Sequence, residues 1–313
     1  MEKFLLIGGG KASGKSVIRG LLDGHPQLFV SIFHEVIFQS LYENDKNLLK
    51  KKDIQEIRNL LASKGHYYQL ERLNRKAFYH TIAGADHRKI DTKNFDFYSF
   101  DKSWVDELYK KGTQWTSQEV CKAIYRSFNK HVVSPFLKGS SKKKYYCGLS
   151  DGFPNAITGF LKNYPKSKII YIKRDPIAMV DGLVKRAFKK IPNDDRSNGF
   201  TRDNLFKKWG TFDFLKTVIE LNKEADKAKK KYPKQVLILH FSDFFEKHEK
   251  EKLKIVKFLK IYDHISLKNY SIGGVKMVSS DKTSFLSKPM DVDYAGLKKT
   301  EVKKLKSILN KII

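Results

Sequence analysis

Short apolar runs alternate with helical patterns along most of this chain. Five runs of aliphatic and aromatic residues have the length of buried strands: 3–8, 28–32, 145–149, 168–173 and 236–240. Helical patterns follow them at 15–23, 157–164, from Pro176 onwards, and at 204–231, 248–260 and 296–311. Strands that alternate with helices predict an α/β fold, in which helices cover both faces of a central parallel sheet.

One block, residues 43–140, interrupts this alternation because it is polar and mostly helical. Within it, Thr116 and Glu119 have the spacing of a capping box and predict that a helix begins there. We therefore expect a single domain over 1–313, with a helical insertion at about 43–140 that shapes part of the binding site.

The composition is that of a globular protein, with 41% hydrophobic residues in a chain of 313. No apolar run approaches the about 20 residues of a membrane span, and the run Phe4–Ile7 is too short for a signal peptide. Two cysteines, Cys121 and Cys147, are too few for a disulfide framework or a metal-ligand cluster. We expect both cysteines to be reduced and buried, and the protein to be cytoplasmic.

The formal net charge of +28 comes from 52 lysines and 10 arginines. Proteins that recognise nucleic acids usually rely on the paired hydrogen-bond donors of arginine, whereas these lysines are scattered along the chain without a recognition motif. The charge therefore predicts that a basic cleft attracts an anionic ligand, and not that nucleic acid is the primary partner.

A glycine-rich loop joins the first predicted strand to the first predicted helix. Residues 9–16 fit the pattern G-x-x-x-x-G-K-[ST] of phosphate-binding loops in P-loop NTPase-like folds. Backbone N–H groups of such a loop converge on one point, and the dipole of the following helix adds partial positive charge there. The sequence therefore predicts that an oxyanion of a nucleotide binds at this loop.

Three segments, in this order, resemble the bacterial-type and carbohydrate-type sulfotransferases that use 3′-phosphoadenosine 5′-phosphosulfate (PAPS). Residues 7–30, with their Asp-Gly-His-Pro run, resemble the phosphosulfate loop and first helix of that family. Residues 168–176 end in Arg-Asp-Pro and resemble its second nucleotide motif. Residues 236–244 and 254–259 are similar to its late strand and the helix after it.

The resemblance implies transfer of a sulfuryl group from PAPS to a hydroxyl or amine of a small-molecule or glycan acceptor. The product of the donor is then adenosine 3′,5′-bisphosphate (PAP), and no metal ion is required. The loop residues implied to contact the 5′-phosphosulfate are Gly10, Lys11, Ala12, Ser13, Gly14, Lys15 and Ser16.

The sequence departs from the family pattern at the cation of this loop. The family has a basic residue where this chain has Ala12, while Lys15 occupies a position usually held by threonine. Either Lys11 or Lys15 can supply the charge. Lys15 is slightly favoured, because the first residue of the predicted helix faces the anion directly.

The resemblance assigns Arg174 to the 3′-phosphate, a role that suits the paired donors of a guanidinium. The structural alternative is an ion pair with Asp175. The family adds a serine eight residues after the arginine, where this chain has Gly182, and Lys185 or Arg186 are candidate substitutes.

Glu35 is the predicted general base, because residues 35–38 resemble the carboxylate-then-aromatic segment of carbohydrate sulfotransferases. A partly dry cleft would raise the pKa of such a carboxylate into a useful range. His34 is the competing candidate, and the structural alternatives are a core histidine and a first-turn helix acid. Asp151 is expected to line the site in an undefined role.

Lys276 and Lys282 lie in a basic, glycine-bearing tail, near the point where relatives close a basic loop over the nucleotide. A solvated loop is the simpler interpretation of each lysine taken alone.

Two other functions fit parts of the sequence. An ATP- or GTP-dependent kinase would use Lys15 and Ser16 on phosphate and Mg²⁺, with Asp151 or Asp175 as a further metal ligand. A non-catalytic nucleotide- or polyanion-binding protein fits the departures at Ala12 and Gly182. The oligomeric state is not predicted. Aromatic residues of the insertion are candidates either for acceptor contacts or for the core: Tyr67, Tyr68, Phe97, Tyr98, Trp104 and Trp115.

Overall fold

A five-stranded parallel sheet forms the centre of the protein. The computed structural model describes residues 3–34, 49–50, 53–63, 97–131, 144–149, 156–188, 202–272, 275–276, 294 and 296–313. The strand order in the main sheet is β2-β5-β1-β6-β7, and every neighbouring pair is parallel. The strands are β1 (Lys3–Gly8), β2 (Leu28–His34), β5 (Tyr145–Leu149), β6 (Lys168–Lys173) and β7 (Val236–His240). All five predicted strands and the α/β fold class are thereby confirmed.

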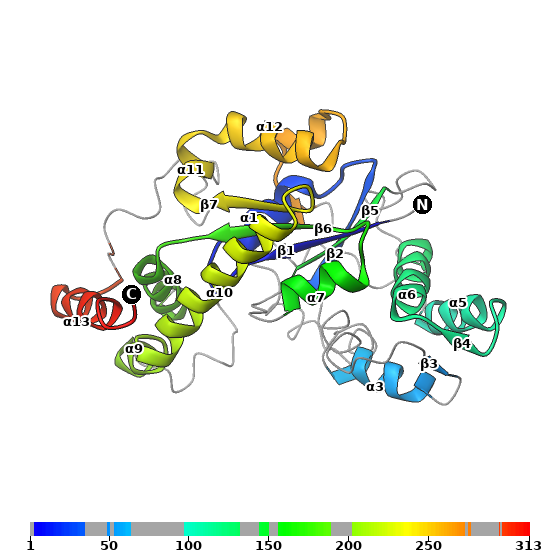
Figure 1. The fold of residues 1–313 in the computed structure, drawn as a ribbon, viewed down its shortest axis with the longest axis horizontal. Helices are drawn as coiled ribbons and strands as arrows, with labels where there is room; N and C mark the ends of the chain where they lie inside the picture. The colour runs from blue at the N-terminus through cyan, green and yellow to red at the C-terminus, as the bar shows by residue number, and fades with distance from the viewer. Residues whose placement is uncertain are drawn as a thin grey trace.

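Helices cover the sheet on both sides, and in Figure 1 α11 and α12 lie above it while α7 and α10 cross in front of it. The helices outside the 43–140 block are α1 (Lys15–Leu22), α7 (Ala156–Asn163), α8 (Pro176–Phe188), α9 (Arg202–Trp209), α10 (Phe212–Lys231), α11 (Phe241–Glu246), α12 (His248–Leu259), the 3₁₀ turn η5 (Ile265–Lys268) and α13 (Lys299–Leu309). In the part of the chain that the structure describes, no helix is long and apolar enough to cross a membrane.

Aromatic rings fill the layer between the sheet and α6 (Ser117–His131). Phe4, Tyr146 and Phe29 stand at matching register positions on three neighbouring strands, so their side chains point to one face. Tyr125 of α6 packs against this row, with ring centroids 5.3 Å from Tyr146 and 6.0 Å from Phe4. The continuous apolar runs in the sequence arise because residues on both faces of these strands are buried.

The prediction of one continuous helix at 204–231 is wrong, because the structure has two helices there, α9 and α10. The backbone N–H of Gly210 donates to the carbonyl of Phe206 at 2.7 Å and closes α9. A side chain at this glycine would lie 2.8 Å from that same carbonyl oxygen. Thr211 then caps α10 by accepting a hydrogen bond from the N–H of Phe214 at 3.2 Å.

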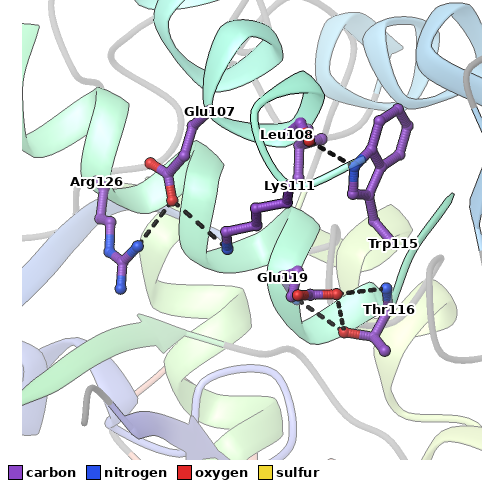
Figure 2. Close-up of polar contacts among 7 residues, drawn as sticks. All are labelled: Glu107, Leu108, Lys111, Trp115, Thr116, Glu119 and Arg126. Carbon is purple, nitrogen blue, oxygen red and sulfur yellow. Dashed lines mark hydrogen bonds and ion pairs between the residues drawn. The ribbon is translucent and has the colours of Figure 1, made fainter. Parts of the chain in front are cut away.

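The described part of the 43–140 block contains the helices α3 (Ile54–Ser63), α5 (Phe97–Tyr109) and α6. It also holds two short strands, β3 (Leu49–Lys50) and β4 (Gln114–Trp115), which pair antiparallel. The aromatic candidates Trp104 and Trp115 are fully buried, and Trp115 Nε1 donates to the carbonyl of Leu108 at 2.7 Å (Figure 2). These two tryptophans are therefore core residues.

The expected capping box begins α6, as Figure 2 shows. Glu119 Oε2 accepts from the N–H of Thr116 at 2.9 Å, and Thr116 Oγ1 accepts from the N–H of Glu119 at 3.2 Å. The hydrogen bond from the Thr116 backbone is the main cause that lowers the pKa of Glu119. The stability that this contact contributes is present above the ordinary glutamate pKa and is lost as the pH falls through the lowered one.

Thr116→Ala tests this cap. We expect the free energy of unfolding in urea at neutral pH to fall by about 1 kcal/mol, because the N–H of Glu119 loses its acceptor. Thr217→Ala is the matched control, since the Thr217 hydroxyl donates to the Asp213 carbonyl inside α10 and caps no helix. An equal loss in the two variants would contradict the capping role.

The carboxyl ends of all five strands meet at one edge of the sheet. The sheet order changes direction at β1, with β2 and β5 on one side and β6 and β7 on the other. Ligands of open α/β sheets bind in the crevice outside the strand ends at such a switch point. In Figure 1, α8, α9 and α13 lie at this end, whereas α5 and α6 lie towards the other.

The C-terminal segment docks on the helices beside this edge. Leu305 of α13 is fully buried in a cluster with Ile177 and Val180 of α8 and Phe206 of α9. The N–H of Gly296 donates to the buried Asp181 carboxylate at 2.7 Å. Earlier in the tail, β8 (Ser271–Ile272) and β9 (Val275–Lys276) pair antiparallel.

Candidate functional site

The loop after β1 has the backbone conformation that its glycines predict. Gly9 and Gly14 have φ angles of +147° and +96°, which side chains other than hydrogen rarely allow. Ala12 adopts a left-handed φ of +60° without being glycine. A side chain at Gly10 would lie 2.6 Å from Met179 Cε. The loop is therefore packed closely against its surroundings, and it leads directly into the N-terminus of α1, where N–H groups point towards a ligand.

Lys15 lies inside this loop. Its Nζ donates to the carbonyls of Gly9 at 3.0 Å and Gly10 at 2.6 Å, and lies 3.5 Å from Ser13 Oγ. Only 4% of the Lys15 surface is exposed. The Lys15 ammonium therefore places a positive charge among the loop carbonyls, next to the N-terminus of α1.

Lys11 also belongs to the loop, but its side chain is exposed. Its Nζ is 4.8 Å from the centre of the Trp209 ring at the end of α9. The two lysines that the sequence left as alternatives therefore occupy different environments: Lys15 contacts loop carbonyls, and Lys11 contacts an aromatic ring.

Arg174 follows β6 and reaches across to the loop. Its Nη1 donates to the carbonyl of Ala12 at 2.8 Å, so the guanidinium lies beside the turn that precedes α1. A Cβ at Gly182 would be 3.5 Å from the same nitrogen, which is ordinary contact distance. The structure thus brings together the loop, Arg174 and Gly182, which are far apart in the sequence.

Asp175 holds the start of α8. Its Oδ1 accepts from the N–H of Ala178 at 2.7 Å and from Tyr294 Oη at 3.3 Å. The carboxylate therefore orders the helix that follows Arg174 and connects it to the C-terminal segment.

Phe241, which carried no role in the sequence interpretation, completes the site. Its ring lies 4.4 Å from the guanidinium carbon of Arg174, and a Cβ at Gly14 would be 2.1 Å from Phe241 Cε2. The side chain is 4% exposed. The sequence offers one signal for this role, the position of Phe241 directly after β7. An aromatic residue at such a position is usually a core residue, so the signal does not point to a site.

The His25 side chain, part of the run that resembles the family, has a structural role. The N–H of Gln27 donates to Nδ1 at 3.1 Å, so Nε2 carries the proton and donates to the carbonyl of Tyr262 at 3.0 Å. The ring is fully buried. His25 therefore ties the end of α1 to the chain after α12.

Several predicted residues lie outside this description. Glu35, Asp151 and Lys282 are not among the described residues, and His34 and Lys276 are described only as backbone positions in β2 and β9. The same holds for Lys185 and Arg186 in α8. Their roles stay predictions. Within the described ranges no three His, Cys, Asp or Glu side chains gather as a metal site would require.

Comparison with solved structures identifies the fold. The chain matches the sulfotransferase domain of the Synechococcus PCC 7002 olefin synthase over 98% of its own length and 94% of that domain, with a TM-score of 0.51 and 14% identity. The chain has the sulfotransferase fold.

Two further solved structures match nearly the whole chain. The sulfotransferase domain from the curacin biosynthetic pathway matches with a TM-score of 0.46 and 13% identity, covering 99% of this chain and 98% of that one. Retinol dehydratase in a complex with retinol and PAP matches with a TM-score of 0.43 and 11% identity, covering 98% and 80%. No family model and no curated protein matches the sequence.

Gly14→Ala tests the close contact on which the sulfotransferase-fold site is built. We expect it to lower the free energy of unfolding by about 2–5 kcal/mol, because positive-φ strain adds to a collision with the Phe241 ring. Gly112→Ala is the matched control: Gly112 also has a positive φ, +131°, but nothing lies within 4 Å of the added methyl. It should cost only about 1–2 kcal/mol.

A double variant separates the collision from the strain. Gly14→Ala should cost less in a Phe241→Leu background than in the natural chain, since the smaller side chain leaves room. Equal costs in both backgrounds, measured by urea unfolding, would show that the ring is not the obstacle.

Proposed function

We propose that this protein is a sulfotransferase that moves a sulfuryl group from PAPS to a hydroxyl or amine of an acceptor. The observation that carries the proposal is the contact of Arg174 with the glycine-rich loop, in a chain with the sulfotransferase fold. A single hydrogen bond joins the two features that suit an anion, the glycine-rich loop and the Arg174 guanidinium. A nucleotide with a phosphosulfate at one end and a second phosphate on its ribose requires this pair of features.

The chemistry of the residues fits such a donor. The loop leads directly into α1, which begins at Lys15, so the N–H groups and the dipole of the helix N-terminus favour an anion there. Arg174 offers the paired donors that match a phosphate. When bound, the donor supplies the sulfuryl group that is transferred.

In this proposal Lys15 and Lys11 supply positive charge at opposite sides of the loop. Charge spreads over the equatorial oxygens during sulfuryl transfer, so stabilising that charge and positioning the acceptor are the main catalytic tasks. Lys15 holds the shape of the loop through its three oxygen contacts, and its charge acts on the anion from within the loop. Glu35 is the proposed base that takes the proton of the acceptor, with His34 as the alternative.

The reaction needs no metal ion, and the acceptor is a small molecule or glycan, with the 43–140 insertion shaping its site. Cys121 and Cys147 are buried and form no disulfide, which suits a reducing cytoplasm, where we expect the protein to act.

Calorimetric titration tests the donor. We expect PAP to bind in the presence of EDTA, and ATP with Mg²⁺ to bind much more weakly, because Arg174 serves a 3′-phosphate that ATP lacks. Metal-dependent binding of ATP with no response to PAP would overturn the proposal in favour of a kinase.

Arg174→Gln assigns the second phosphate. We expect it to weaken PAP binding about 10- to 100-fold while leaving adenosine 5′-monophosphate unchanged, since it removes charge-assisted hydrogen bonds worth about 1.5–3 kcal/mol. Arg126→Gln is the control, because Arg126 pairs with Glu107 at 2.7 Å between α6 and α5 (Figure 2). Equal losses for both nucleotides would contradict the assignment.

Gly182→Ser is the complementary gain-of-function variant. The new Cβ fits at 3.5 Å from Arg174 Nη1 and 3.8 Å from Ala12 Cβ, so the hydroxyl would stand beside the guanidinium. We expect PAP to bind about 2- to 10-fold tighter through one added hydrogen bond. Unchanged or weaker binding of PAP would place the 3′-phosphate elsewhere.

Glu35→Gln tests the base. Sulfuryl transfer to the acceptor should collapse while PAP affinity measured by calorimetry persists, because the amide cannot accept the proton. Persistent turnover would transfer the role to His34, which His34→Gln then tests in the same way.

A further inference from the structure

Trp209 stands beside the phosphate loop at the corner between α9 and α10. It is partly exposed, whereas Trp104 and Trp115, the other tryptophans of the chain, are fully buried. Two ammonium groups contact its ring: Lys11 Nζ at 4.8 Å and Lys208 Nζ at 5.3 Å from the centroid. One of these lysines belongs to the loop itself and the other to α9.

The surrounding structure fixes the position of this ring. Trp209 is the last residue of α9, and Gly210 and Thr211 immediately begin the turn into α10. Phe214 packs edge-on against the indole, with centroids 5.5 Å apart and an interplanar angle of 71°. The indole is therefore a fixed partner, towards which the exposed Lys11 side chain extends.

The two loop lysines are held with different strength. Lys15 is buried and has three oxygen contacts, whereas Lys11 is exposed and contacts an aromatic face. A cation–π contact at an exposed site is weaker than a charge-assisted hydrogen bond to a phosphate or sulfate oxygen. Repulsion from Lys208 on the same ring weakens the contact further. An anion bound in the loop would therefore draw Lys11 away from the indole.

We propose that Trp209 is a positioning residue for Lys11: its ring holds the ammonium at the edge of the loop until the donor binds, and the lysine then transfers to the anionic end of the donor. This inference rests on the proposed function. It gives Lys11 and Lys15 separate tasks, since Lys15 keeps the loop formed and Lys11 is the mobile cation.

Tryptophan fluorescence tests the movement, because Trp209 is the tryptophan that a dissolved quencher reaches. We expect PAP to change the iodide quenching and the emission of Trp209 in the natural chain, and this response to be lost in Lys11→Met. Lys208→Met is the matched control: it removes the other lysine from the same ring but leaves the loop unchanged, so it should retain the response. A response that persists in Lys11→Met would mean that the nucleotide itself contacts Trp209, and would overturn the proposal.

A double-mutant cycle gives a second, independent readout. If the ring competes with the donor for Lys11, Trp209→Leu should bind PAP about two- to fivefold tighter by calorimetry, the ratio that corresponds to an exposed cation–π contact. The gain should vanish in a Lys11→Met background. A ring with a purely structural role would instead weaken binding in both backgrounds, and that result would overturn the proposal.

Trp209→Phe guards against misfolding of the leucine variant, because it keeps a smaller aromatic ring in place. We expect Trp209→Phe to bind PAP with an affinity between that of the natural chain and that of Trp209→Leu. An affinity equal to that of the natural chain would count against the proposal. Failure of the natural chain to bind PAP at all would overturn the proposed function together with this inference. Normal PAP binding without the Lys11-dependent response would overturn this inference alone.

Discussion

The ring of Phe241 lies against the backbone of Gly14 and under the guanidinium of Arg174. This contact joins the ends of β1, β6 and β7, because Gly14 follows the first strand, Arg174 the second and Phe241 the third. Since a methyl group at Gly14 would have to lie 2.1 Å from the ring, glycine at this position lets the loop after β1 approach Arg174 so closely. This packing and the hydrogen bond from Arg174 to the Ala12 carbonyl together hold the loop beside Arg174.

Positive charge is abundant in this chain, and the structure uses it in different ways. Inside the loop, Lys15 stabilises a turn rich in carbonyl groups. At the opposite edge of the sheet, the ammonium groups of Lys144 and Lys168 donate to the carbonyls of Lys260 and Phe258, at the end of α12. Burial, followed by the neighbouring lysines, lowers the pKa of Lys168 to about 8. The net charge alone therefore could not locate a binding site.

Sequence patterns predicted the elements well where local chemistry decides them. The capping box of Thr116 and Glu119 begins α6, Pro176 is the first residue of α8, and the apolar runs are the strands. The prediction at 204–231 was wrong because helical periodicity continues through Gly210, while the backbone turns there and Thr211 starts a new cap. The aromatic residues Trp104 and Trp115 could not be distinguished as core from sequence, since burial depends on what packs against them.

The strand–loop–helix at residues 3–22, the alternating α/β order and the place of Arg174 after a buried strand all follow from the amino-acid sequence. These features depend on local propensity, periodicity and glycine spacing, all of which can be read along a single chain. The contacts of Lys15 with loop carbonyls, of Lys11 with Trp209 and of Phe241 with the loop and Arg174 became visible only in the folded protein. Such contacts join residues from different strands and helices, whose separation in space is set by sheet order and packing.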